Sequence, residues 1–135
     1  MSGIGEGLLI LIVEDNEMNM RLARDVLQFH GFRTLGTVNG EDGVTMAREN
    51  LPDLILMDIS LPGIDGVEAT RQLKDEPSTA SIPIVALTAS VLQADRTRFE
   101  SAGFVGLIAK PIDVLTFPAE VLAYCTKRSN GPEHG

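Results

Sequence analysis

The strongest structural signal in this chain is the stretch DLILMDISLPGIDGV at positions 53–67. Its apolar run, 54–57, ends in the carboxylate of Asp58, and the turn-forming sequence SLPG follows at 60–63. An apolar run between Pro52 and a turn predicts a strand buried on both faces, as in a parallel sheet. Because ligands bind outside the carboxyl ends of such strands, Asp58 either caps the next element or faces a ligand.

Apolar runs elsewhere predict four more strands, at 8–13, 34–38, 83–87 and 105–109. The run at 34–38 is the least apolar, which indicates an edge strand. Helix-forming segments separate these runs, and parallel neighbours are joined by right-handed helical crossovers. We therefore predict an α/β fold with a doubly wound, five-stranded parallel sheet.

Turn and cap residues mark the expected helix ends. Asp15 or Asn16, Asn39 and Asp65 are predicted N-caps, and Gly31 and Gly103 are predicted terminators. A last helix is expected to open at Asp113 and to run through Tyr124, with Pro118 in its first turn.

Length, charge and cysteine content narrow the class of protein. The chain has 135 residues, which suits one domain at 8–126 between a flexible leader, 1–7, and a disordered tail, 127–135. A formal net charge of -8 argues against nucleic-acid or anionic-membrane binding. No apolar stretch approaches the roughly twenty residues of a membrane span. A single cysteine and no secretory signal predict a cytoplasmic protein.

Chemically active side chains stand where the predicted strands end: Glu14 and Asp15, Asp58, Thr88 and Lys110. In a parallel sheet these ends share one edge. Two like charges about 4 Å apart repel by roughly 4 kcal/mol at an effective dielectric constant near 20. Three carboxylates with one lysine therefore favour a divalent cation, and Mg2+ fits best. Beside such a cation Asp58 becomes a plausible nucleophile toward phosphorus, with Lys110 and Thr88 binding phosphoryl oxygens.

Each of these residues also has a structural interpretation. Asp15 and Asp58 suit helix or turn caps, Thr88 a structural hydroxyl and Lys110 a solvated lysine. Their coincidence at four strand ends is what favours a site. Other sites fail: the two histidines lack partners for zinc, and neither a dinucleotide fingerprint nor a P-loop occurs.

These residues resemble the receiver domain of bacterial two-component response regulators, over positions 8–124. The motifs are VEDN at 13–16, LILMDISLPGIDG at 54–66, LTAS at 87–90 and KP at 110–111. The amino-acid sequences of these motifs are most similar to those of stand-alone receivers of the DivK type and of receivers in hybrid kinases. The start at Met1 favours an independent protein over a piece of a hybrid kinase.

The resemblance implies a flavodoxin-like (βα)5 fold and a phosphorelay function. Asp58 would accept a phosphoryl group from a histidine kinase or histidine phosphotransfer protein, and the acyl phosphate would hydrolyse slowly. Asp15, Asp58 and the Ser60 carbonyl would hold Mg2+, with Glu14 assisting through water. Lys110 would pair with phosphoryl oxygens, Thr88 would turn inward, and a cis peptide bond would join Lys110 to Pro111.

One departure from the family pattern concerns signal output. The family has an aromatic switch residue three positions before the lysine, where this chain has Leu107. We therefore expect output to rely more on backbone shifts at 88–92. The residues expected to change or to meet a downstream protein are Thr88, Ala89, Val91, Leu92, Phe99, Leu107 and Pro111, on the face of the fourth helix, fifth strand and fifth helix. The apolar side chains among them equally suit the core, and for Phe99 alone the core is the favoured interpretation. The protein would be a monomer or weak dimer, and the subgroup suggests cell-cycle or developmental control.

Two other functions stay open at this point. The first is that the chain is an interaction module that has lost phosphorylation, and Leu107 favours this function slightly. Alternatively it is a phosphohydrolase with an aspartyl nucleophile, but such enzymes need a second acid two residues later, where this chain has Ser60.

Overall fold

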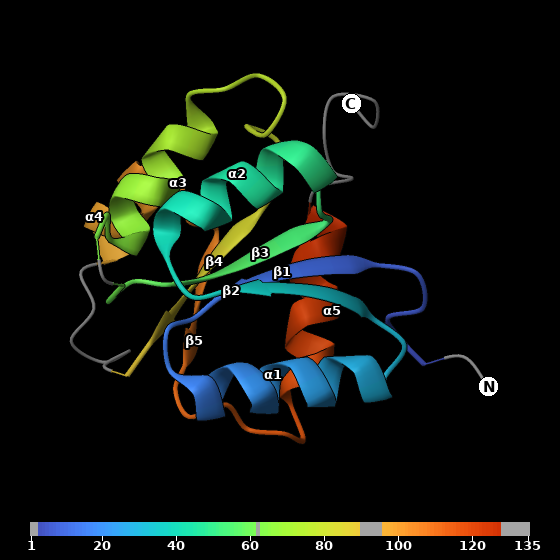
Figure 1. The fold of residues 1–135 in the computed structure, drawn as a ribbon. Helices are drawn as coiled ribbons and strands as arrows, with labels where there is room; N and C mark the ends of the chain where they lie inside the picture. The colour runs from blue at the N-terminus through green and yellow to red at the C-terminus, as the bar shows by residue number, and fades with distance from the viewer. Residues whose placement is uncertain (1–2, 62, 90–95, 128–135) are drawn as a thin grey trace.

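A computed structural model describes residues 3–61, 63–89 and 96–127 and contains a five-stranded parallel sheet (Figure 1). The strand order is β2-β1-β3-β4-β5. The strands are β1 (Leu9–Val13), β2 (Arg33–Thr37), β3 (Leu54–Asp58), β4 (Ile84–Thr88) and β5 (Gly106–Ala109). The helices are α1 (Glu17–Phe29), α2 (Gly40–Asn50), α3 (Gly66–Lys74), α4 (Arg96–Ala102) and α5 (Phe117–Lys127). The predicted doubly wound α/β architecture is confirmed.

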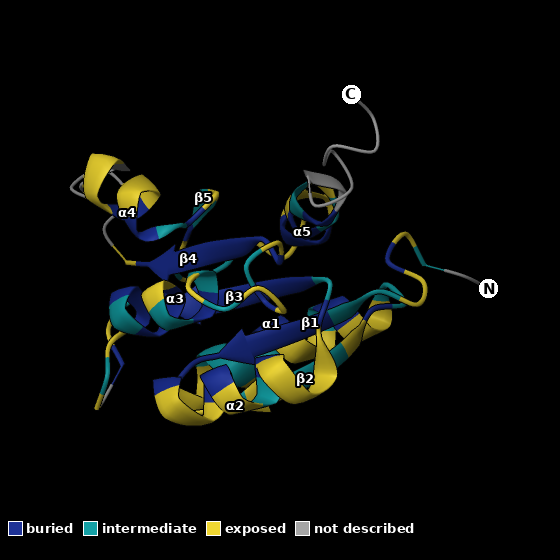
Figure 2. Cartoon of the chain, turned by 90° about the horizontal axis from the view of Figure 1, so that it is seen from above, coloured by how far each residue is buried: buried dark blue, intermediate teal, exposed yellow. Residues whose placement is uncertain are grey.

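Strand side chains alternate between two cores because successive residues of a strand point to opposite faces. Leu11 and Val13 of β1 pack in the core under α2, α3 and α4, whereas Ile10 and Ile12 pack in the core under α1 and α5. Strands β1, β3 and β4 are buried on both sides, and most exposed residues lie on the outer faces of the helices (Figure 2). The edge strand β2 is only partly buried, which explains its less apolar sequence.

The local signals read from the sequence correspond to observed caps. Asn16, Asn39 and Asp65 are N-caps, and each side chain accepts a hydrogen bond from the backbone N–H three residues later. Gly31 and Gly103 end α1 and α4 with φ angles of 93° and 113°, a region that favours glycine.

The boundaries differ from the prediction mainly at the last helix. It begins at Phe117 and not at Asp113. The side-chain carboxylate of Asp113 accepts a hydrogen bond from the N–H of Leu115. The backbone carbonyl of Asp113 accepts hydrogen bonds from the N–H groups of Thr116 and Phe117. These bonds form a turn before the helix, and Pro118 lies in the first helical turn as predicted.

Residues 3–7, for which we predict flexibility, lie against the start of β2. The N–H of Gly5 donates to the His30 carbonyl at 3.0 Å, and the Arg33 guanidinium donates to the Gly7 carbonyl at 3.4 Å. None of the helices in the described ranges is long and apolar enough to cross a membrane.

Candidate functional site

The register of the sheet brings the predicted site residues to one edge. Asp58 of β3 is paired with Leu87, and Thr88 of β4 is paired with Ala109. Glu14 and Lys110 directly follow β1 and β5. The expectation that residues far apart in sequence meet beyond the strand ends is therefore correct for this edge.

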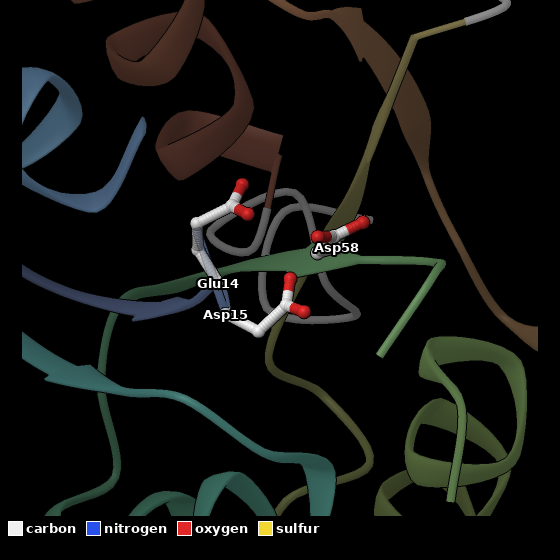
Figure 3. Close-up of side chains that lie close together, drawn as sticks. All are labelled: Glu14, Asp15 and Asp58. Atoms are coloured by element: carbon white, nitrogen blue, oxygen red, sulfur yellow. The ribbon is translucent and has the colours of Figure 1, made fainter. Parts of the chain in front are cut away.

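The carboxylates of Glu14, Asp15 and Asp58 form an acidic cluster. Each contributes an oxygen, and these oxygens lie within 4.8 Å of one another (Figure 3). Glu14 and Asp58 have exposed fractions of 1% and 2%, whereas Asp15 is exposed. The cluster therefore has two buried carboxyl groups and one exposed carboxyl group.

Lys110 supplies the positive charge closest to this cluster. Its Nζ lies 3.1 Å from Oδ2 of Asp58 and 3.5 Å from Oε1 of Glu14. Burial by itself lowers the pKa of the lysine. The hydrogen bond and charge of Asp58, together with Glu14, outweigh burial, so that the pKa of Lys110 is raised above its ordinary value. Lys110 is therefore a permanent cation in this site.

One lysine does not balance the buried acids. Burial is the largest effect on Glu14 and, with the neighbouring Asp58, raises the pKa of Glu14 from 4.5 to about 7. A hydrogen bond from the Asn16 N–H to Oε2 at 3.1 Å and the charge of Lys110 act in the opposite direction. Without a further cation the cluster therefore retains a proton on Glu14 close to neutral pH.

The cluster has the donor set of a hard divalent cation. Carboxylate oxygens are the ligands that such ions prefer, and a dication would offset the charge that otherwise keeps Glu14 protonated. Asp58 is already oriented, because its Oδ1 accepts from the Ser60 N–H at 3.0 Å while Lys110 holds Oδ2. The residues present therefore fit a metal-assisted reaction at the Asp58 carboxylate.

The expected switch residues lie around this edge. Thr88 is buried at the end of β4, and its carbonyl accepts from the Lys110 N–H at 2.8 Å. Ala89 is exposed, Leu107 is half-buried in β5, and the peptide bond between Lys110 and Pro111 is cis.

One residue of the expected output face lies in the core. Phe99 is 5% exposed and packs edge-to-face on Phe104, which agrees with the core role that the sequence favours for Phe99 alone. Val91 and Leu92 lie outside the described residues, as do Pro62 and Ser90 of the quoted motifs.

The structure adds two contacts that the sequence did not indicate. The backbone N–H of Asn16 donates to Glu14, and the carboxylate of Glu41 accepts from the N–H of Ile64 at 3.2 Å. The first is a backbone contact with no residue-type signal. The second joins the first turn of α2 to the connection between β3 and α3, 23 positions further along the chain, so no local pattern reveals it.

A family model described as "Response regulator receiver domain" matches residues 10–121. This chain belongs to the response regulator receiver domain family. The receiver domain is 44% identical over 115 residues to the polar-differentiation response regulator DivK of Brucella anthropi, covering 85% of this chain and 94% of that protein. Its identity to the DivK of Brucella ovis is 43%, with the same coverage.

Solved structures agree with this assignment. A putative response regulator of Chloroflexus aurantiacus superposes with a TM-score of 0.83 at 28% identity, over 88% of this chain and 98% of that one. The receiver domain of the sensor histidine kinase PA1611 of Pseudomonas aeruginosa gives a TM-score of 0.82 at 34% identity, over 89% and 98%. That structure has a magnesium ion coordinated in its active-site cleft. The predicted family and fold are thus confirmed, and the alternative functions are not favoured.

Proposed function

We propose that this receiver domain accepts a phosphoryl group on Asp58 from a phosphohistidine of a histidine kinase or phosphotransfer protein. The observation that carries the proposal is the 3.1 Å contact between Lys110 and Asp58 beside two further acids. A buried carboxylate held by a lysine within a metal-binding acid cluster suits phosphoryl transfer better than a structural role.

Four groups would hold magnesium: the carboxylates of Glu14, Asp15 and Asp58 and the carbonyl of Ser60. Magnesium, when bound, supplies positive charge next to the nucleophilic oxygen and the phosphoryl group. Of these groups, the Asp15 side chain is exposed and the Glu14 side chain is buried. Glu14 would therefore contribute by adding negative charge near the ion.

The protein residues orient the nucleophile and receive the charge. The Ser60 N–H and Lys110 fix the two Asp58 oxygens before the donor arrives. An Asp58 oxygen then forms the bond to phosphorus as the bond from phosphorus to the donor imidazole breaks, and the imidazole leaves with that electron pair. The Lys110 ammonium would offset the negative charge of the phosphoryl oxygens of the acyl phosphate, and the Thr88 hydroxyl would donate a hydrogen bond to one of them.

The signal would pass by protein contact in the cytoplasm. The face of α4, β5 and α5 is the proposed contact for a downstream protein, with Thr88, Ala89 and Pro111 next to the phosphorylated residue. Leu107 offers a smaller surface change than an aromatic ring, which supports output through the backbone after Thr88. The DivK relatives support a role in cell polarity or differentiation.

Intact-mass measurement after incubation with Mg2+ and acetyl phosphate tests this function. We expect the wild-type protein and the exposed-surface control Asp42→Asn to gain the mass of one phosphoryl group, and Asp58→Asn to gain none. A folded wild-type protein that binds Mg2+ but gains no mass would contradict the proposal and favour an interaction module.

A further inference from the structure

Glu41 lies in the first turn of α2 and contacts the loop that begins at Asp58. Its Oε2 accepts the Ile64 N–H at 3.2 Å across 23 positions of sequence. The same carboxylate lies over Gly63, where an added Cβ would be 2.7 Å from Oε2. Gly63 has a φ angle of 73°, so glycine is suited both to the turn and to this close approach.

The helix backbone reinforces this contact. Gly40, the buried first residue of α2, faces Ile64 so closely that an added Cβ would be 2.8 Å from Ile64 Cγ1 and 2.9 Å from its carbonyl. Ile64 packs against the core cluster between the sheet and α2, α3 and α4. Helices α2 and α3 lie side by side on this face of the sheet (Figure 1).

The same loop is fixed at the other side of Ile64 by α3. Asp65 caps this helix, and a Cβ added to Gly66 would be 2.4 Å from the Asp58 carbonyl. The start of α3 therefore packs directly on the backbone of the proposed phosphorylation site. Ser60, whose carbonyl would bind magnesium, lies between Asp58 and the contacts made by Glu41.

From these contacts we propose that Glu41 is a positioning residue of the magnesium site. Its carboxylate holds Ile64 just before the start of α3, and the packing of Gly66 in that helix on the Asp58 carbonyl then keeps the backbone of Asp58 in place for the ion. This inference rests on the proposed function. Residues that orient ligands of a metal commonly tune its affinity without touching the ion.

A simpler role for Glu41 is that of an acid near a helix N-terminus, where a negative charge is favourable. Two substitutions separate the roles. Glu41→Gln keeps the length and an oxygen acceptor but loses the charge, whereas Glu41→Asp keeps the charge but shortens the reach to Ile64. Asp42→Ala is the matched control, because Asp42 is exposed in the same turn and its carboxylate accepts from the side chain of Asn39 in that turn.

Calorimetric titration with Mg2+ measures the magnesium dissociation constant of each variant. We expect Glu41→Ala and Glu41→Asp to raise the magnesium dissociation constant by about three- to tenfold, the effect of roughly one ordinary hydrogen bond. Glu41→Gln and Asp42→Ala should stay close to wild type. In phosphorylation by acetyl phosphate, the Mg2+ concentration that gives the half-maximal rate should rise in Glu41→Ala and Glu41→Asp. The phosphorylation rate at saturating Mg2+ should be retained in both.

Hydrogen exchange of the Ile64 amide in metal-free protein provides a readout independent of magnesium. Exchange should accelerate in Glu41→Ala and Glu41→Asp but not in Glu41→Gln. Glu41→Ala and Asp42→Ala are compared in their magnesium dissociation constants, their Mg2+ concentrations for half-maximal rate and their Ile64 exchange rates. If all three agree, the positioning role is overturned while the proposed function stands. Equal weakening by Glu41→Gln and Glu41→Ala would assign the effect to charge and also overturn it. A wild-type protein without Mg2+ binding or phosphorylation would instead overturn the proposed function.

Discussion

In metal-free protein, substitution of Glu14 by glutamine should raise stability in a manner that depends on pH. The pKa of Glu14 is about 7 in the folded protein, against 4.5 for the ordinary group. Glutamine retains an oxygen for the Asn16 N–H and an amide that can donate to Asp58. It loses the 3.5 Å contact that Oε1 accepts from Lys110, and it never carries the buried negative charge. The variant therefore isolates the cost of ionising one acid in this cluster.

The raised pKa of Glu14 decides whether stability rises or falls with pH. Protonated Glu14 contributes its full stability below about pH 4.5, and this contribution is lost as the pH rises to about 7, because the folded state then must release a proton that the unfolded state has already lost. A difference of about 2.5 pH units corresponds to at most about 3–4 kcal/mol, since each unit is about 1.4 kcal/mol. Local relaxation and water entry reduce this value, so about 1–3 kcal/mol is the expected range.

Urea unfolding followed by circular dichroism, in EDTA and across this pH range, measures the effect. We expect wild type and Glu14→Gln to differ little near pH 4.5 and the variant to be the more stable above pH 7. Saturating Mg2+ should remove or reverse this advantage, because the ion favours the ionised acid. A stability difference that is independent of pH in EDTA would refute the assignment of a charge penalty to Glu14.

Three further predictions concern other parts of the fold. Burial, followed by the charge of Asp53, raises the pKa of the Cys125 thiol to about 12, so iodoacetamide at about pH 8 should label it only in denaturing urea. Phe117→Ala removes a fully buried ring and should lower the free energy of unfolding by about 3–5 kcal/mol, measured by urea titration. Gly66→Ala should destabilise by about 1–3 kcal/mol and weaken Mg2+ binding in calorimetry, because its Cβ meets the Asp58 backbone. A stabilised Gly66→Ala protein would show that helix propensity prevails over this clash.

Local patterns in the amino-acid sequence were sufficient to predict the helices and strands and the gathering of Glu14, Asp58 and Lys110 at one edge of the sheet. The apolar runs around 9–13, 54–58 and 84–88 are uninterrupted because these strands are covered by helices on both faces. Asn16, Asn39 and Asp65 form caps with backbone groups only three residues away, so their signals are local. Parallel pairing then places the residues that follow the strands at one edge, whatever the details of packing.

Contacts between distant segments required the folded structure. Glu14 and Asp15 are adjacent acids in the sequence, yet one is buried with a raised pKa and the other is exposed, because only Glu14 turns under the sheet edge toward Lys110. Glu41 in the first turn of α2 reaches Ile64 in the connection between β3 and α3, 23 positions away. Burial and hydrogen bonding between separate elements depend on how those elements pack in space, and neither residue type nor spacing along the chain records that arrangement.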